Sequence, residues 1–286
     1  MNKKRYLLII WIITLICIIA GILIHFGGLF TGVSFFHYST TNGKFVTDVQ
    51  SFGNVDVGEM TIDADIADID ISYGDKLEVT SIYPKKYLPK VTYKDGVLNI
   101  KESYHKTINL SPSVINKDKY SMKIVIPTDA VIKNANITLN LGDININDVD
   151  SEKLFIDNKL GDIKIKSAEG KNADISLSLG DLHLDNSKYD AVDVNNDLGD
   201  INLDGDYADM DLACSMGSVK VRSTGKANKV KAVNDLGDIE LDGDFDIIDA
   251  YCDAGDIDIT TKGEVDKNKI TARCDLGDVT VNGEDY

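Results

Sequence analysis

Cysteine, histidine, proline and tryptophan are scarce in this chain. Its 286 residues include four Cys, four His, four Pro and one Trp. The histidines are scattered, so neither a zinc site nor a Ser-His-Asp triad can be assembled from the sequence. They are His25, His37, His105 and His183. A P-loop and a dinucleotide-binding fingerprint are also missing. We therefore predict a protein that is not an enzyme, with no catalytic residues and no bound cofactor.

Few long apolar runs after residue 30 suit a helix, and the one strong run lies at the N-terminus. Lys3, Lys4 and Arg5 precede an uninterrupted apolar stretch over residues 6–24, which continues to residue 30. This length spans a bilayer, and the flanking cations place the N-terminus in the cytoplasm. A cleaved signal peptide is the alternative, but its apolar region would normally be shorter and end in a small-x-small cleavage site.

The sequence therefore predicts a single-pass protein of the cell membrane. Residues 1–5 are expected to form a cytoplasmic tip, 6–30 a transmembrane signal anchor and 31–44 a linker, with the remainder extracellular. Residues 45–133 and 134–286 are expected to form two β regions.

A short motif recurs eight times in the second half of the chain. The copies read LGDI, LGDI, LGDL, LGDI, MGSV, LGDI, AGDI and LGDV, and successive glycines are 19, 19, 19, 18, 20, 18 and 22 residues apart. A fixed period of this size is typical of a solenoid, whose units bury their apolar faces only by stacking on their neighbours. The predicted corner glycines are Gly142, Gly161, Gly180, Gly199, Gly217, Gly237, Gly255 and Gly277.

Apolar residues alternate on both sides of each glycine. They stand two and four positions after it, as Ile163 and Ile165 do, and five and seven positions before it, as Ile156 and Leu154 do. Period-2 alternation indicates strands with one buried face, and the Gly-Asp pair indicates a tight corner between two strands.

The sequence thus predicts an all-β fold, a single-stack parallel β-solenoid of ~19-residue coils with variable return loops. We expect the residues before the glycines to stack in one buried column: Leu141, Leu160, Leu179, Leu198, Met216, Leu236, Ala254 and Leu276.

Residues 45–133 are expected to hold degenerate first coils and a hairpin. FGNVDV (52–57) and IADIDI (66–71) resemble weak copies of the corner, with Gly53 and Ala67 in place of the glycine. Asp95-Gly96 between two alternating segments predicts a β-hairpin. Residues 122–126 predict a strand that Pro127 closes, after a polar loop at 110–120.

Negative charge is concentrated in the repeats. Residues 134–286 contain 34 acidic and 15 basic residues, whereas residues 1–133 contain 13 and 15. Nucleic acid and anionic lipid are therefore excluded as partners of the repeats, whereas cations and basic peptides remain possible, as does a role in solubility alone.

The residue after each glycine forms a column of aspartates, with Ser218 as the exception. We expect each carboxylate to cap its own corner by accepting backbone N–H bonds. Weak Ca²⁺ binding along the column is the alternative, although neither the glycine-rich nonapeptides of calcium-loaded β-rolls nor an EF-hand loop is present. The candidate metal ligands are Asp143, Asp162, Asp181, Asp200, Asp238, Asp256 and Asp278.

Three cysteines and three asparagines share the inward position three residues before the glycine. Asn158, Asn196 and Asn234 are expected to satisfy buried backbone groups with their amides, and the cysteines to act as small buried fillers. Cys252 and Cys274 belong to adjacent coils, and whether they are bridged stays open at this point.

The chain resembles the bacterial putative-adhesin β-strand-repeat family, which includes LiaG-like cell-envelope proteins of Gram-positive bacteria. The resemblance rests on the N-terminal anchor, the degenerate corner, the hairpin VTYKDGVLNI, the strand KIVIP and the repeated x-L-G-D-I-x-I. It covers residues 45–286. The family is a domain of unknown function, so the resemblance implies a surface-exposed scaffold with a role in attachment or envelope stress and assigns no site residues.

We therefore expect a membrane-anchored, non-enzymatic scaffold that contacts proteins or the cell envelope. The first alternative is an acidic module that binds cations or basic peptides, and the second is a polysaccharide-active enzyme that uses paired carboxylates. Only residues 282–286 follow the last predicted coil, and we expect them to be too short for a capping strand. The C-terminal coil is accordingly a candidate surface for self-association.

Overall fold

The computed structural model describes residues 44–102, 120–262 and 267–286. The predicted tip and membrane span lie outside these residues, as do all of the predicted linker except Lys44 and all of the polar loop at 110–120 except Tyr120. Within the described ranges, no helix is both long and apolar enough to cross a membrane.

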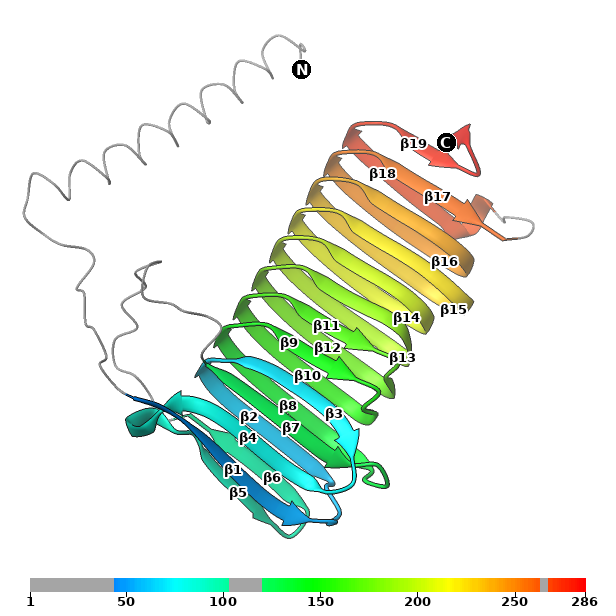
Figure 1. Ribbon diagram of the computed structural model, residues 1–286. Helices are drawn as coiled ribbons and strands as arrows, with labels where there is room; N and C mark the ends of the chain where they lie inside the picture. The colour runs from blue at the N-terminus through cyan, green and yellow to red at the C-terminus, as the bar shows by residue number, and fades with distance from the viewer. Residues whose placement is uncertain (1–43, 103–119, 263–266) are drawn as a thin grey trace, which may run out of the picture. The chain divides into compact units, whose positions relative to one another are not determined.

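The described residues stack as parallel coils, one above another, along a single axis (Figure 1). In the early coils each turn contains a longer strand, a corner and a shorter strand. These pairs are β2 (Glu59–Ile66) with β3 (Asp68–Gly74), β8 (Ile132–Leu141) with β9 (Ile144–Asn147), and β10 (Ser151–Leu160) with β11 (Ile163–Lys166). Successive strands pair in parallel and in register, for example Ile163 with Leu182 and Ile156 with Ile175. The predicted parallel β-solenoid is therefore confirmed.

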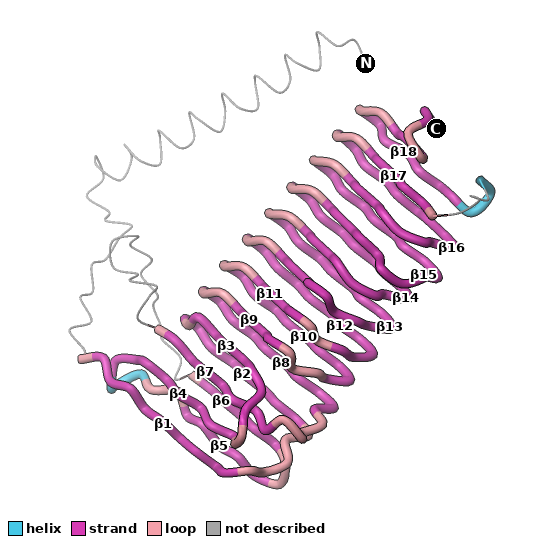
Figure 2. The backbone as a smooth tube through the Cα atoms, turned by 45° about the vertical axis from the view of Figure 1, so that its right-hand side comes forward, coloured by secondary structure: helices cyan, strands magenta, loops and turns pink. Residues whose placement is uncertain are grey.

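The return segments of the later coils are strands, although the sequence predicted loops there. After β12 (Glu169–Leu179), one continuous strand leads from the second half of each coil into the first half of the next, as Figure 2 shows. These long strands are β13 (Leu182–Leu198), β14 (Ile201–Met216), β15 (Val219–Leu236) and β16 (Ile239–Ala254). Register shifts such as that between Gly205 and Asp209 absorb the differences in repeat length. The polar composition of these segments is typical of loops, but their backbones pair with the adjacent coils and so form strands.

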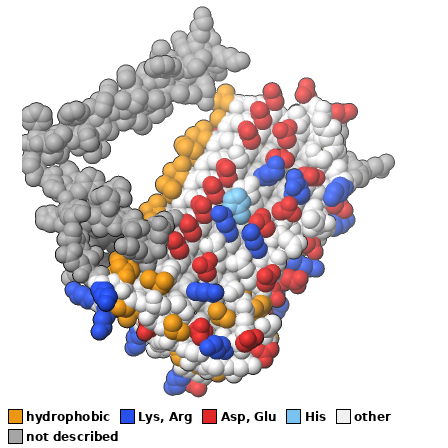
Figure 3. All heavy atoms as spheres, in the orientation of Figure 1, with side chains coloured by type: hydrophobic (Ala, Val, Ile, Leu, Met, Phe, Trp, Pro, Cys, Tyr) orange, Lys and Arg blue, Asp and Glu red, His pale blue; other side chains and the backbone are white. Residues whose placement is uncertain are grey.

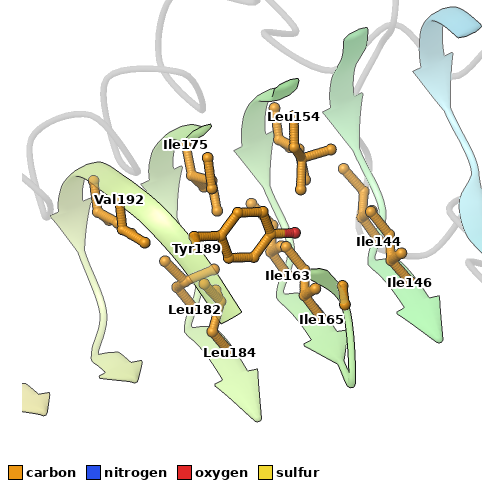
Figure 4. Close-up of a cluster of buried hydrophobic side chains, with 14 of the residues drawn as sticks. Ile144, Ile146, Leu154, Ile163, Ile165, Ile175, Leu182, Leu184, Tyr189 and Val192 are labelled. Carbon is orange, nitrogen blue, oxygen red and sulfur yellow. The ribbon is translucent and has the colours of Figure 1, made fainter. Parts of the chain in front are cut away.

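The core is the narrow interior between the two strand layers of each coil. The residues two and four positions after the repeat glycines are buried from Ile144 to Ile259. Figure 4 shows Leu154, Ile175 and Val192 facing Ile163 and Leu182 across this interior, with the ring of Tyr189 among them. Because every coil adds apolar side chains to the same column, the hydrophobic core is continuous along the stack.

Antiparallel strands cover the first coils. β1 (Phe45–Gly53) pairs with β4 (Leu77–Pro84), and β4 pairs with β7 (Ser121–Pro127). The predicted hairpin is confirmed as β5 (Lys90–Lys94) and β6 (Val97–Lys101), with φ of 51° at Asp95 and 81° at Gly96. A short 3₁₀ helix, η1 (Lys85–Tyr87), precedes it.

One of the two predicted degenerate corners is correct. Ala67 joins β2 to β3 and donates its N–H to the carbonyl of Leu141, as the repeat glycines do with the next coil. Gly53 instead ends the antiparallel strand β1, so it is not a solenoid corner. The coil below β2 and β3 is built from β6 and β7, which come later in the chain.

The last coil contains β17 (Ile257–Thr261), the 3₁₀ helix η3 (Lys267–Lys269), β18 (Ile270–Leu276) and β19 (Val279–Val281). The expectation that residues 282–286 cannot form a strand is wrong. A turn at Asn282 and Gly283 lets β20 (Glu284–Asp285) pair with β19 in the antiparallel sense. Tyr286 also donates its hydroxyl to the carbonyl of Ile270 at 2.7 Å.

The repeat glycines are required by close backbone approach as well as by their turn conformation. Seven of the eight have φ between 129° and 152°, a region that L side chains rarely adopt. A Cβ atom on Gly199 would lie 2.0 Å from the carbonyl oxygen of Gly180 in the preceding coil. Each corner glycine therefore contacts the next one with no room for a side chain between them.

We predict that Gly199→Ala destabilises the protein by at least ~3 kcal/mol, because it combines backbone strain with a clash that requires the coils to separate. Gly53→Ala is the matched control, since Gly53 also has a positive φ of 82° but would place its Cβ in open space. The control should cost only about 1–2 kcal/mol. Thermal unfolding of the purified variants measures both, and equal losses would contradict the close-contact explanation.

Candidate functional site

The column of aspartates forms a hydrogen-bonded ladder between coils. Each carboxylate accepts the backbone N–H of the residue at the same position in the next coil. Asp143 Oδ1 accepts the N–H of Asp162 at 3.0 Å. In the same way, Asp162 Oδ1 accepts the N–H of Asp181 at 3.1 Å, and Asp181 Oδ1 accepts the N–H of Asp200 at 2.9 Å. The expected backbone partners are therefore confirmed. They lie in the adjacent coil, however, and not within the same corner as expected.

The ladder extends over nearly the whole stack. Asp68 in the first coil bonds the N–H of Asp143, and Asp200 bonds that of Ser218 at 2.8 Å. Ser218 has no carboxylate to continue the ladder, which resumes from Asp238 to Asp256 and from Asp256 to Asp278. Each aspartate thus contributes a link between coils, which explains its recurrence without a metal ion.

The interior of the corner is filled by asparagine, cysteine and glycine carbonyls. Asn158 Nδ2 donates to the carbonyls of Gly142 and Gly161, both at 3.1 Å. Asn196 and Asn234 donate to the glycine carbonyl of the preceding coil in the same way, which confirms the predicted amide role. Cys214 Sγ donates to Gly199 at 3.4 Å, and burial raises the pKa of this thiol to about 11. The structure joins Cys252 to Cys274 in a disulfide between adjacent coils.

The residues before the glycines do stack in one column, but they face solvent, so the predicted buried leucine column is wrong. In-register pairs link Ile66 to Leu141, Leu160 to Leu179 and Leu198 to Met216. Exposed fractions of 44–49% are found for Leu179, Leu198, Met216, Leu236 and Leu276, whereas Ile66, Leu141, Leu160 and Ala254 are intermediate. We call these nine residues the leucine column.

The physical reason for this exposure lies in the residue three places before the glycine. That side chain already occupies the inside of the corner, so the apolar side chain just before the glycine points outward. In four coils the inner side chain also donates to a glycine carbonyl, from Asn158, Asn196, Cys214 or Asn234. The sequence contained one signal of this. In three coils, a buried Asn holds the inward position three residues before the glycine. If the leucine two residues later also pointed inward, it would leave no room for the Asn amide.

Acidic side chains flank the leucine column on both sides. The aspartate ladder follows it, and in the later coils a second exposed acid precedes it: Asp197, Asp235, Asp253 and Asp275. Figure 3 shows the resulting surface as a hydrophobic stripe along one edge of the stack with acidic side chains beside it. Arg273 pairs with Asp275 at 2.8 Å. In the part of the chain that the structure describes, no ion pair involves Asp197, Asp235 or Asp253.

The other charged residues form pairs and no compact reactive cluster. His183 lines a shallow hollow with Asp185, Asp204, Lys220 and Arg222. Lys220 pairs there with Glu240, and Arg222 lies 3.5 Å from Asp204. Across the described ranges, no group of three or more His, Cys, Asp or Glu side chains is arranged to hold a metal ion. The structure therefore brings the predicted aspartates together only as the ladder.

One buried carboxyl lies where the first coils meet. Glu102 follows β6 and accepts the N–H groups of Asp65 at 2.7 Å and Ile66 at 3.0 Å. Burial is the largest cause that raises the pKa of Glu102, and with the neighbouring Asp65 and Asp63 it brings this pKa to about 7 against the opposing effect of the two N–H bonds. No sequence pattern indicates this buried carboxyl, because Glu102 lies outside the repeats.

Comparison with known proteins identifies the family of this solenoid. The family model Toastrack DUF4097 matches residues 57–282. The chain therefore belongs to the Toastrack DUF4097 family, which confirms the resemblance to a family of β-strand repeats of unknown function. No curated protein matches the chain in sequence.

Solved structures resemble this chain at low sequence identity. A protein from Parabacteroides distasonis ATCC 8503 named a putative lipid binding protein has a TM-score of 0.51 and 17% identity, over 84% of this chain and 97% of that chain. A putative adhesin from Bacteroides fragilis NCTC 9343 has a TM-score of 0.41 and 19% identity, over 83% and 97%. A putative adhesin from Parabacteroides merdae ATCC 43184 has a TM-score of 0.38 and 14% identity, over 84% and 96%.

We predict that Glu102 makes the stability of the protein depend on pH. The pKa of Glu102 in the folded chain, about 7, is above the value of about 4.3 for an unfolded glutamate. Its contribution to stability is therefore present below about pH 4 and is lost as the pH rises through 7. Glu102→Gln, which keeps an acceptor oxygen, should be more stable than the parent at pH ~8 by up to ~3 kcal/mol, with little difference at pH ~4.

Denaturant unfolding at several pH values measures this difference. Glu59→Gln is the matched control, because Glu59 is exposed on the adjoining strand β2. A gap between Glu102→Gln and the parent that stays constant with pH would show that Glu102 does not bind a proton in this range.

Proposed function

We propose that the protein is a membrane-anchored, extracytoplasmic scaffold that contacts other proteins or components of the cell envelope and catalyses no reaction. The observation that supports this proposal most strongly is the leucine column, a regular exposed apolar surface on a rigid stack of coils. The apolar segment at residues 6–30 supports the anchor, and the cations at its N-terminal end support the orientation.

A catalytic role has less support from the geometry. A retaining glycosidase needs two carboxyl groups about 5–5.5 Å apart, one of which an apolar or like-charged pocket keeps protonated. The ladder carboxylates instead accept backbone N–H bonds and line an open corner. In the described coils, none of these aspartates lies in a pocket that distinguishes it from the others.

The names of the solved relatives suggest two functions, adhesion and lipid binding. Adhesion fits an exposed rod whose sides carry ordered side-chain columns. Binding to anionic lipid fits less well, because the repeats carry a net charge of −19 and would be repelled by such a surface. We therefore favour a protein partner over a lipid surface for the solenoid.

Cross-linking on intact cells tests the proposal. A membrane-impermeant, lysine-reactive cross-linker reaches exposed lysines of the rod, such as Lys171 and Lys188, only if the solenoid lies outside the membrane. We expect the chain in the membrane fraction, with covalent adducts to a small, reproducible set of envelope proteins. A chain lacking residues 1–30 should be absent from the membrane fraction and should form no adducts with envelope proteins. A full-length chain found in the cytosol, or on the membrane without adducts, would refute the scaffold.

Self-association through the C-terminal coil is a second contact that we propose for the scaffold. Within the described residues, β18 pairs only with β16, so its outer edge can accept a strand. In the same cross-linking experiment, adducts between two copies of the chain through Lys269 would support this contact.

An acidic module that binds cations is the alternative, and the aspartate ladder motivates it. Because the ladder carboxylates from Asp143 to Asp256 already have backbone N–H partners, we expect Ca²⁺ to produce only a small rise in the unfolding temperature, similar to that from Mg²⁺. A ligand that binds only the native state stabilises it by mass action. A large, saturable rise with Ca²⁺ alone would therefore favour cation binding over the scaffold.

A further inference from the structure

The leucine column is long enough to seat one extended partner segment. From Leu179 to Leu276 it crosses five coil steps, which at ~4.8 Å each amount to about 24 Å. Ala254 stands in register between Leu236 and Leu276 and has the smallest side chain of the column.

The backbone beside the column is not free to pair with a partner. The N–H of Gly180 donates to the carbonyl of Leu198 at 2.9 Å, and the N–H of Leu182 donates to the carbonyl of Asp200 at 2.8 Å. The N–H of Asp200 donates to the carboxylate of Asp181. The same bonds recur from coil to coil. A partner therefore cannot add a strand along this edge and must be recognised through side chains alone.

An α-helix meets this requirement, because its own backbone is satisfied internally. Its pitch of about 5.4 Å is closer to the coil spacing than the ~6.8 Å between same-face residues of a strand. A column of about 24 Å corresponds to roughly 16 helical residues at 1.5 Å each. Apolar residues at i, i+3, i+4 and i+7 of such a helix form a stripe that can lie along the leucines.

Charge selects among the helices that could bind. Asp197, Asp235 and Asp253 stand beside the column without ion pairs among the described residues, and the aspartate ladder lies on the other side. Lys or Arg residues flanking the apolar stripe of a helix would face these carboxylates. A second copy of the column, or an anionic membrane, would instead bring like charges together.

We propose that the leucine column and its flanking aspartates are the docking surface for a cationic amphipathic helix. This inference rests on the proposed scaffold function and names the surface and the chemistry of the partner. The apolar side chains supply most of the contact, and the aspartates fix the choice of a basic partner and speed its association.

The test uses the full chain in phosphatidylcholine nanodiscs and a fluorescein-labelled synthetic helix of about 18 residues, with a leucine stripe flanked by lysines. Fluorescence anisotropy measures its binding. Two variants remove the surface: the triple variant Leu198→Gln, Met216→Gln, Leu236→Gln, and the triple variant Asp197→Asn, Asp235→Asn, Asp253→Asn. Each has a matched control that changes exposed residues elsewhere: Val49→Gln with Val131→Gln and Phe155→Gln, or Asp174→Asn with Asp190→Asn and Asp209→Asn.

We expect saturable binding that weakens about tenfold or more in each surface variant and changes less than about twofold in the controls. Binding should also weaken as NaCl rises from ~50 to ~300 mM, and a peptide with glutamates in place of lysines should not bind. Circular dichroism confirms that each variant keeps the parent's β signal.

Three results would overturn the inference: no binding of the lysine peptide, binding that the surface variants leave unchanged, or flotation with phosphatidylglycerol vesicles that depends on the leucines while the peptide does not bind. The cross-linking experiment separates this failure from failure of the scaffold. Envelope adducts that persist in the leucine triple variant would leave the scaffold intact and place its contact on another face.

Discussion

The close contact between glycine backbones of successive coils is the constraint on which the other features depend. The carbonyl of each corner glycine lies where a Cβ atom of the next would be, as between Gly180 and Gly199. Several of these carbonyls accept a hydrogen bond from a side chain inside the coil, as Gly180 does from Asn196. That side chain fills the corner, and the next apolar residue is turned outward. This contact thus accounts for the glycine and, in the coils with Asn158, Asn196 and Asn234, for the inward amide and for the outward direction of the residue before the glycine.

The sequence predicted the fold well, because period and alternation are local properties. The interval between glycines, the Asp95-Gly96 hairpin and the Ala67 corner were all visible in the residues. Three other features could not be predicted from the sequence, because they depend on contacts with the neighbouring coil. Asp181 bonds the coil that follows it, the polar segment at 185–191 pairs as a strand, and Leu198 points to solvent. A one-residue change in the position of the bend reverses which side of the coil a side chain faces.

The leucine column is not required by the fold, and this gives it functional interest. Met216 and Ala254 occupy the same position as the leucines, and the register continues through both. The core lies elsewhere, among residues such as Ile163 and Leu182. A row of apolar side chains that contributes little to the core but recurs from coil to coil is a surface suited to contact. The aspartates on either side limit that contact to basic partners.

The direction of the leucine side chains is the central claim, and cysteine labelling tests it most directly. Leu198→Cys and Val194→Cys lie on the same strand, β13, in chains whose Cys17 and Cys214 are replaced by alanine. Val194 is 1% exposed and Leu198 44%. The labelling rate with a maleimide reagent under native conditions should be close to that of the unfolded chain for Leu198→Cys and far lower for Val194→Cys. Equal protection of the two cysteines would show that the column is buried and would contradict the account.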